Sequence, residues 1–488
     1  MSRDWEERPD LVGERLGGAA LYCNDEFFAP KENLVRPEAP IFDPDRYTER
    51  GKWMDGWETR RRREPGHDWC ILRLGTPGTL EGVVIDTRHF KGNYPEAARL
   101  SGCYLEGVPD RAALEAAPWH EVLPKTPLEG DTQNRFDVTC PYGFTHVRLE
   151  IFPDGGVARL RAYGRPLPGV PAGRTNLAAV ECGALVEEAS DMFFSSRHNL
   201  LLPGPPTHMG DGWETRRRRG PGNDWVVVRL AAPGRVEEIV VDTTHFKGNA
   251  PGACALSGRR EAGPWQPLLE RTALQPHTVH RFADLAEHDL VDTVRLDIYP
   301  DGGVARLRIL GTVPDPLRRG LGVERLDRLP PEAAEAAFLQ CCGSRRWAEA
   351  MAARRPFGTE EALLTTAEAI WRDLEVEDWL EAFAAHPRIG ERRAAQTTGE
   401  TAARWSRQEQ AGAAAAAPAV LEALAEMNRR YEEKFGFVFL IFATGKRAEE
   451  MLDAARERLE HDRETELRIA AAEQMKITKR RLEKWLDR

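Results

Sequence analysis

The chain has 488 residues, of which 41% are hydrophobic and 30% charged, proportions that are ordinary for a globular protein. This length exceeds what one hydrophobic core supports, so we expect several domains. The formal net charge of −10 argues against a general nucleic-acid binder.

Targeting and membrane signals are not seen in the sequence. The first residues, MSRDWE, do not form the apolar core of a signal peptide. No run of about eighteen apolar residues occurs, so we expect no membrane span and no membrane partner. The eight cysteines are scattered and form no CxxC pair, which predicts a reducing, cytoplasmic location.

An internal duplication fills the first two thirds of the chain. Residues 55–63 read DGWETRRRR, and residues 211–219 repeat these letters. Two further motifs recur in the same order: HFKGN at 89–93 and 245–249, and PDGGVARLR at 153–161 and 300–308. Units of about 150 residues are the size of domains rather than of solenoid repeats.

The duplicated part has the texture of β structure. Residues 147–151 and 294–298 alternate apolar and charged side chains, as half-buried strands do. The following Pro-Asp-Gly-Gly predicts a tight turn, in which Asp154 and Asp301 are ordinary turn residues. Many short strands separated by Gly and Pro predict a sandwich or jelly roll.

The last third is rich in Ala, Leu, Glu and Arg and poor in β-branched residues, which predicts an all-α domain. We expect helices over 366–385, 411–434, 448–459 and 464–486, with Gly436 as a helix stop. The predicted division is a first β repeat at 1–165, a second at 166–312, a linker at 313–321 and a helical domain at 322–488.

Three features of the helical domain are candidates for chemistry. His386 follows an amphipathic helix, where it could equally complement the helix C-terminus. Ser406 and Glu409 have the spacing of a capping box, which is the structural alternative to a functional role. Arg481 lies on a stripe with Leu467, Ala470, Gln474, Ile477 and Trp485, so it either faces inward toward an anion or belongs to a solvated basic face.

Four ordered motifs, HPRIG, WSRQEQAG, NRRYEEKFGFVFLIFATG and EQMKITKRRL, make residues 322–488 resemble 2-oxo-4-hydroxy-4-carboxy-5-ureidoimidazoline (OHCU) decarboxylase. The resemblance implies a cofactor-free helical enzyme that forms (S)-allantoin and CO2. It implies that His386 and Glu409 are catalytic and that Arg481 contacts substrate. The implied binding positions are Pro387, Ser406, Arg407, Gln408, Gln410, Phe439, Leu440, Ile441, Phe442 and Ala443.

Two simpler interpretations exist for the motif DGWETRRRR: a sheet edge whose arginines prevent pairing with another chain, or a basic surface that binds polyanions. Neither explains why its Asp, Trp, Glu and Thr recur in register together with HFKGN and PDGGVARLR. These motifs make residues 15–312 resemble allantoicase. The resemblance implies two galactose-binding-like jelly-roll repeats and hydrolysis of allantoate to (S)-ureidoglycolate and urea. The predicted fold is therefore multidomain, with two all-β sandwiches followed by an all-α domain.

Arginines suit the substrate carboxylate, and we expect Arg60 and Arg216 to bind it. Our catalytic candidates are Asp55, Glu58, His89 and Lys91, with their counterparts Asp211, Glu214, His245 and Lys247. A divalent metal stays open for this half, although no HxxxH or HxH spacing supports one, and we assign no metal ligand. The expected partners are small anionic ureido substrates and further copies of the chain in a homo-oligomer. The alternatives are that the β half is a non-catalytic ligand- or glycan-binding scaffold, or that one repeat is silent.

Overall fold

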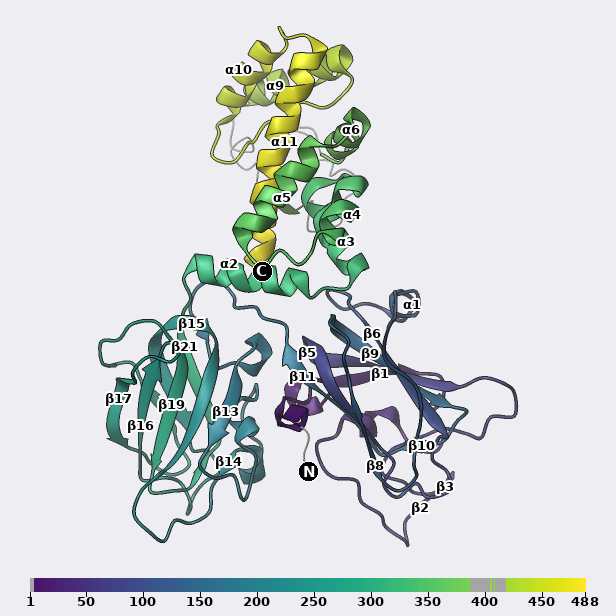
Figure 1. The fold of residues 1–488 in the computed structure, drawn as a ribbon, viewed down its shortest axis with the longest axis vertical. Helices are drawn as coiled ribbons and strands as arrows, with labels where there is room; N and C mark the ends of the chain where they lie inside the picture. Colours follow the sequence, from purple (N-terminus) through teal and green to yellow (C-terminus); the bar gives the residue numbers. More distant parts are fainter. Residues whose placement is uncertain (1–3, 387–403, 406–407, 409–417) are drawn as a thin grey trace. The chain divides into compact units, whose positions relative to one another are not determined.

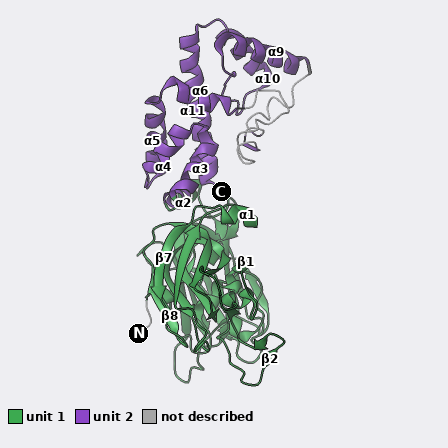
Figure 2. Ribbon diagram, turned by 90° about the vertical axis from the view of Figure 1, so that its right-hand side faces the viewer, with its two compact units in different colours: residues 1–321, 328–330, 488 green, residues 322–327, 331–487 purple. Residues whose placement is uncertain are grey.

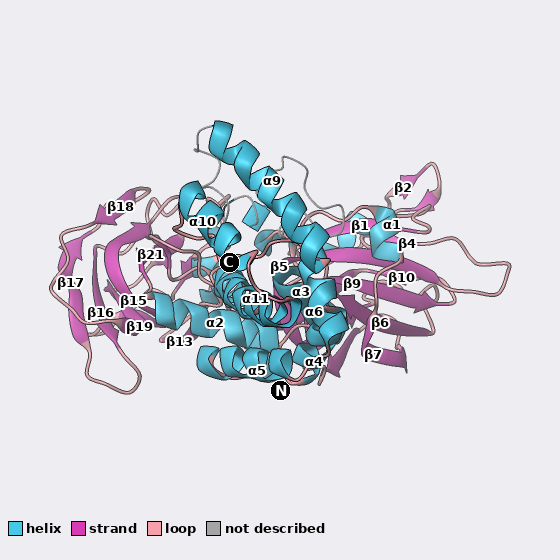
Figure 3. Ribbon diagram, turned by 90° about the horizontal axis from the view of Figure 1, so that it is seen from above, coloured by secondary structure: helices cyan, strands magenta, loops and turns pink. Residues whose placement is uncertain are grey.

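The computed structural model describes residues 4–386, 404–405, 408 and 418–488 (Figure 1). The chain forms two compact units (Figure 2). The first comprises residues 1–321, 328–330 and 488, and the second comprises residues 322–327 and 331–487. Figure 3 shows that strands dominate the first unit and helices the second.

A long bent strand, β5 (Asp68–Asp86), organises the first repeat. Its first half pairs with β1 and β9, and its second half pairs with β8 and β11, so it belongs to both faces of a sandwich. One sheet runs in the order β1-β5-β9-β6-β7. The strands are β1 (Ala19–Cys23), β6 (Ala97–Cys103), β7 (His120–Pro127), β8 (Gln133–Asp137), β9 (Gly143–Phe152) and β11 (Arg159–Pro166).

The second repeat has the same topology around β15 (Asp224–Asp242). β15 pairs with β13 and β19 along its first half and with β18 and β21 along its second. The strands are β12 (Thr175–Asn176), β13 (Leu185–Ala189), β16 (Ala253–Arg259), β17 (Gln266–Ala273), β18 (Val279–Phe282), β19 (Val291–Tyr299) and β21 (Arg306–Thr312). The two jelly-roll-like sandwiches confirm the predicted fold of this part.

Alternating side chains of the strands build the core of the sandwiches. Val147, Leu149 and Ile151 on β9 are fully buried, as the sequence pattern predicts. Glu150, expected to face water, is also buried, and Arg99 neutralises it through two hydrogen bonds of 2.6 and 2.7 Å. Most of the buried apolar side chains of both repeats form one continuous cluster.

The second unit is helical. Its helices are α3 (Pro331–Cys342), α4 (Arg345–Ala353), α5 (Glu360–Arg372), α6 (Val376–Ala384), α9 (Pro418–Phe435), α10 (Ala448–Arg458) and α11 (Arg463–Leu486). Gly436 follows α9 with a φ of 80°, and its N–H bonds to Glu432, so it ends the helix as predicted. α11 contacts α3, α5, α6 and α9 and forms the spine of the unit (Figure 1).

The connection between the β and helical parts differs from the expectation. Residues 315–321, which we expected to be linker, belong to helix α2 (Asp315–Asp327). Pro314 precedes this helix, and its carbonyl accepts the N–H groups of Leu317 and Arg318 in the first turn. Within the described part of the chain, no helix is both long and apolar enough to cross a lipid bilayer.

Candidate functional sites

The three motifs of each repeat meet at one end of its sandwich. In the first repeat, β4 (Trp57–Glu58) of DGWETRRRR pairs with β10 (Gly156–Val157) of the PDGG segment. Asn93 of HFKGN donates a 2.7 Å hydrogen bond from Nδ2 to Glu58 Oε1 and accepts the Gly156 N–H through its carbonyl. Motifs that are distant in the sequence therefore share one site.

The second repeat reproduces this arrangement. β14 (Trp213–Glu214) pairs with β20 (Gly303–Val304). Asn249 Nδ2 donates to Glu214 Oε1 at 2.6 Å, and the Asn249 carbonyl accepts the Gly303 N–H at 2.9 Å.

Much of DGWETRRRR holds the fold together. Asp55 Oδ2 accepts a 2.9 Å hydrogen bond from Arg159 Nη2, and both residues are buried. The fully buried Trp57 donates its indole N–H to the Asp25 carbonyl. Thr59 Oγ1 accepts the Gly155 N–H of the turn at 3.1 Å. The repeat-two equivalents make the same contacts: Asp211 with Arg306, Trp213 with the Asp191 carbonyl, and Thr215 with Gly302.

DGWETRRRR has two carboxylates, and Glu58, unlike Asp55, is only half-buried and bonds to no arginine that the structure describes. Burial raises the pKa of Glu58, while the hydrogen bond from Asn93 opposes this shift. A carboxyl group of this kind retains its proton to a higher pH than an exposed one, which suits a general acid.

His89 is held in one orientation by its backbone and its ring. It has a left-handed φ of 72°, its N–H bonds to Asp131 Oδ1 at 2.8 Å, and its Nε2 lies 3.0 Å from the Pro40 carbonyl. Because a carbonyl only accepts, Nε2 carries the proton and Nδ1 of the neutral ring is left as the acceptor. Phe42 stacks on the ring at 5.9 Å.

His245 repeats this geometry with a φ of 73° and an Nε2 distance of 3.1 Å to the Pro206 carbonyl. The lysines differ between the repeats. Lys91 Nζ lies 3.7 Å from Asp131, whereas Lys247 forms no ion pair or hydrogen bond with any residue that the structure describes.

The arginine run divides into paired and unpaired side chains. Arg60 is exposed, binds Asp25 Oδ2 at 2.6 Å and lies over the ring of Phe27. Arg62 bonds to Asp154 through its N–H and to Asp68 through its guanidinium. Arg61 and Arg63 are exposed and bond to no described residue.

The run in the second repeat follows the same pattern. Arg216 pairs with Asp191 at 3.3 Å, and Arg218 bonds to Asp301 through its N–H and to Asp224 through its guanidinium. Arg217 and Arg219 are exposed and bond to no described residue.

Our candidates did not include two residues of these sites, Asn93 and Asn249, which donate hydrogen bonds to the glutamates. Both belong to a motif that recurs in the two repeats. Recurrence was therefore the available signal, but it does not separate a ligand-binding side chain from an anchoring one.

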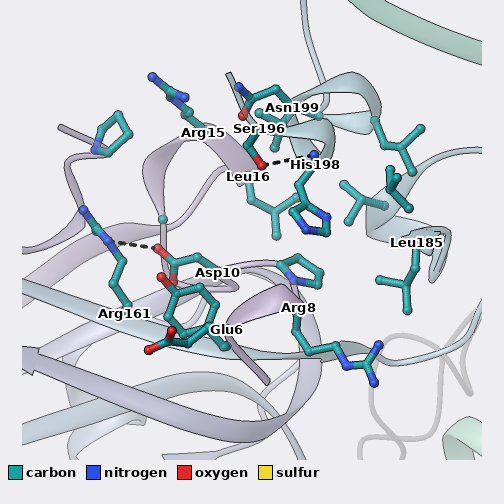
Figure 4. A pocket seen from close by; sticks show the side chains of 18 of the residues that line it. Glu6, Arg8, Asp10, Arg15, Leu16, Arg161, Leu185, Ser196, His198 and Asn199 are labelled. Atoms are coloured by element: carbon teal, nitrogen blue, oxygen red, sulfur yellow. Dashed lines mark hydrogen bonds and ion pairs between the residues drawn. The ribbon is translucent and has the colours of Figure 1, made fainter. Parts of the chain in front are cut away.

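A separate cavity of about 350 Å³ lies between the two repeats (Figure 4). Several of its charged groups are already paired: Arg8 with Glu81, Asp10 with Arg161, and His198 with Glu7. None of the residues predicted from the motifs lines it.

The described residues also contain no group of three or more His, Cys, Asp or Glu side chains placed to hold a metal ion.

In the helical unit, the predicted inward stripe of α11 is confirmed, because all six of its side chains are buried. Arg481 is only 3% exposed, so it does not belong to a solvated face.

His386 lies directly after α6, and its buried Nε2 has no hydrogen-bond partner among the described residues. Burial and the Arg481 charge together lower the pKa of His386 to about 3, against a smaller opposing effect of Gln474.

The segment after α9 lies beside the same end of α6, since the rings of Phe383 and Phe437 are 5.4 Å apart. Four of its predicted binding residues are buried, and Phe442 is half-buried. The structure therefore brings His386, Arg481 and this segment into one region of the unit.

Several predicted residues lie outside the described part of the chain: Pro387, Ser406, Arg407, Glu409 and Gln410. Gln408 is described and is exposed. The choice between a capping box and a catalytic role for Glu409 thus stays a prediction.

Comparisons with known proteins agree with this two-part organisation. The family model described as "Allantoicase repeat" matches residues 9–167 and 175–314, and that of "OHCU decarboxylase" matches residues 327–483. A probable allantoicase of Nocardia farcinica is 51% identical over 314 residues, which are 63% of this chain and 95% of that protein. The allantoicase of Dictyostelium discoideum is 42% identical over 326 residues, which are 63% of this chain and 88% of that protein.

A solved structure agrees with the β part of this organisation. The crystal structure of allantoicase from Saccharomyces cerevisiae is 37% identical, with a TM-score of 0.55, and covers 62% of this chain and 92% of its own. A crystal structure of OHCU decarboxylase in the presence of (S)-allantoin is 40% identical, with a TM-score of 0.28, and covers 31% of this chain and 99% of its own. These matches do not favour a non-catalytic scaffold. The chain belongs to the allantoicase family through its two β repeats and to the OHCU decarboxylase family through its helical part, and it is a bifunctional enzyme of purine catabolism.

Proposed function

We propose that the β repeats hydrolyse allantoate to (S)-ureidoglycolate and urea at the sites built from Glu58 and His89, and from Glu214 and His245. The observation that carries this proposal is the convergence of three motifs, repeated in both sandwiches, around a glutamate bound by asparagine. We further propose that the helical domain converts OHCU to (S)-allantoin and CO2.

Hydrolysis of allantoate breaks the bond between the central carbon and one ureido nitrogen. In our proposal, Glu58 donates a proton to the leaving urea, because its raised pKa keeps it protonated to higher pH. His89 accepts a proton from the attacking water through Nδ1, since Nε2 is bound to the Pro40 carbonyl. In this proposal, Arg60 and Arg61 bind the carboxylate.

Decarboxylation of OHCU leaves an electron pair at C4, which the adjacent C5=N bond of the substrate accepts. The nitrogen of that bond takes up a proton, and the resulting enol then gains a proton at C5 and loses its hydroxyl proton, which gives the C4 ketone of allantoin. Since this sink is part of the substrate, we propose that the domain needs no cofactor. Arg481 binds the anionic substrate, and Glu409 shares the proton transfers with His386.

The low pKa of His386 gives it a defined role in this scheme. The imidazole is neutral at pH 7 and can accept the proton of the 4-hydroxyl. When the anionic substrate binds beside Arg481, it offsets the guanidinium charge that lowers the pKa of His386. Substrate binding therefore raises the affinity of His386 for the proton of the 4-hydroxyl.

We also propose a cytoplasmic homo-oligomer whose two β repeats and helical domain have the bounds expected from the sequence, with residues 315–321 between them helical rather than an irregular linker. All eight cysteines are free thiols, as in proteins of a reducing compartment. Large apolar side chains stay exposed near the motif sites, among them Ile41, Phe193 and Phe194, and such groups favour burial between copies.

The hydrolase proposal is tested by supplying allantoate and measuring urea. We expect His89→Ala and His245→Ala each to lower urea release, and the double variant to lower it by about 100-fold or more, because general acid–base catalysis contributes about 10²–10⁴-fold. A wild-type protein that releases no urea refutes the proposal. If one single variant is as active as wild type, the repeat that carries it is silent.

The decarboxylase proposal is tested with freshly generated OHCU, following loss of substrate and the chirality of allantoin. His386→Ala should slow decarboxylation by about 10²-fold or more. Urea release by the same variant serves as the control for folding and concentration. Racemic allantoin formed at the uncatalysed rate by the wild type removes the assignment.

A further inference from the structure

The segment 438–443 is an unusual piece of backbone. It lies outside every helix, strand and turn, and it has no bend and no residue with a positive φ, so the chain is extended there. Four of its side chains are buried: Phe439, Leu440, Ile441 and Ala443. A buried extended segment with no sheet neighbour must satisfy its N–H and C=O groups in another way.

Two charged side chains bind this backbone from one side. Glu473 Oε2 accepts the Phe442 N–H at 2.6 Å, and Arg458 Nη1 donates to the Leu440 carbonyl at 2.6 Å. In extended backbone, the C=O of one residue and the N–H two residues later lie on the same edge. Glu473 and Arg458 therefore occupy one edge. The N–H and C=O of Ile441 lie on the opposite edge, where they bond to no residue that the structure describes.

Arg458 and Glu473, which bind this edge, are themselves fixed by bonds to other polar side chains. Arg458 Nε donates to Glu466 Oε1 at 2.7 Å, and Glu466 is fully buried. Tyr431 donates its hydroxyl to Glu466, and His461 Nδ1 lies 3.0 Å from the other oxygen of this carboxylate. Glu473 pairs with Lys476 Nζ at 2.5 Å.

Burying such a charged network costs desolvation free energy, and well-packed apolar groups often stabilise a core as well as a buried ion pair does. A cost of this kind is expected where backbone has to be placed accurately at a functional site. The segment lies beside the α6 end that carries His386. A ureido group presents an N–H donor next to a C=O acceptor, which is the complement of the free N–H and C=O of one extended residue.

We propose that Arg458 and Glu473 are positioning residues of the decarboxylase, which hold the segment 438–443 so that the free backbone edge at Ile441 pairs with the ureido arm of the substrate. This inference rests on the proposed decarboxylase function.

The test uses the full chain with Glu473→Ala and Glu473→Gln. The alanine variant removes the acceptor of the Phe442 N–H, and displacement of the segment should lower kcat/KM for decarboxylation by about 10²-fold, the usual effect of a misplacement of about 1 Å. The glutamine variant keeps an acceptor and should stay within about threefold of wild type. Glu464→Ala, which removes an exposed carboxylate from the same helix, is the control and should have no effect.

Calorimetric titration with (S)-allantoin separates positioning from loss of folded protein. We expect Glu473→Ala to bind with a weaker Kd and unchanged stoichiometry, whereas a merely structural role gives an unchanged Kd and fewer sites. Arg458→Lys, which cannot hold Leu440 and Glu466 with one planar fork, should behave like Glu473→Ala, and the exposed Arg456→Lys should not.

The inference is overturned if Glu473→Ala binds (S)-allantoin and decarboxylates OHCU as the wild type does, or if glutamine fails to rescue. A wild-type protein without decarboxylase activity instead refutes the proposed function. Urea release from allantoate by the same chain should stay unchanged in every variant.

Discussion

Asp55 shows how a recurring polar residue can belong to the architecture. Its carboxylate binds Arg159, and the guanidinium of Arg159 also donates to the carbonyls of Glu38, Asp55 and Ala158. These bonds join the chain before DGWETRRRR to β11. An arginine that is 2% exposed needs such a counter-charge, because an unpaired buried cation is strongly destabilising.

We therefore expect Asp55→Asn to act on stability. The substitution keeps an oxygen acceptor but leaves Arg159 without its anion, and loss of one partner of a buried pair costs about 3–5 kcal/mol. Asp211→Asn should have the same effect through Arg306. Urea-induced unfolding followed by tryptophan fluorescence measures the loss. A variant that is as stable as wild type but releases less urea from allantoate would instead assign Asp55 to catalysis in the first repeat.

The sequence identified the recurring motifs, but not which of their residues belong to the core and which to the candidate site. Trp57 and Glu58 are neighbours in one repeated motif, yet one is a fully buried core residue and the other is bound by Asn93. Alternation of adjacent side chains across a strand produces this difference. The contact with Asn93 joins segments far apart in the chain, so local patterns do not contain it.

At the scale of elements, α11 was predictable and the segment 438–443 was not. A helix repeats every 3.6 residues, so the stripe from Leu467 to Trp485 identified its buried face, including Arg481. The segment 438–443 has no period and no strand partner, and side chains of α10 and α11 fix its place. α2 was missed because Gly320 and Gly322 lower helix propensity, yet packing of its apolar residues Val323 and Leu326 prevails.

The position of His386 between α6 and α11 predicts a pH-dependent stability. The unfolded chain binds a proton at His386 near pH 6.5, whereas the folded chain binds it near pH 3. Between these values the unfolded state holds more protons, so the free energy of unfolding of the helical unit falls as pH decreases from about 6.5 and is fully retained above it. His386→Gln should make denaturation, followed by circular dichroism at 222 nm, less dependent on pH in this window. A pH slope equal to that of wild type contradicts the prediction.

At the scale of the whole molecule, the two activities are not consecutive steps. The decarboxylase forms allantoin, whereas the allantoicase uses allantoate, in which the ring has been opened by a hydrolysis that neither part performs. The product of one site must therefore leave the protein and be processed before it returns. We therefore expect the fusion to ensure that both enzymes are produced in equal amounts, rather than to pass an intermediate directly from one site to the other.

Independence of the two activities is the prediction that follows. A protease site inserted between Val313 and Pro314, just before α2, allows the chain to be cut after folding. We expect kcat/KM for allantoate hydrolysis and for OHCU decarboxylation to stay within about twofold of the uncut protein, because neither set of site residues includes a group from the other part. Both rates are measured on one sample before and after cleavage, with gel filtration to follow the fragments. A large loss of either rate on cleavage shows that the fused arrangement itself supports catalysis, and it replaces the co-production account with a physical coupling between the two enzymes.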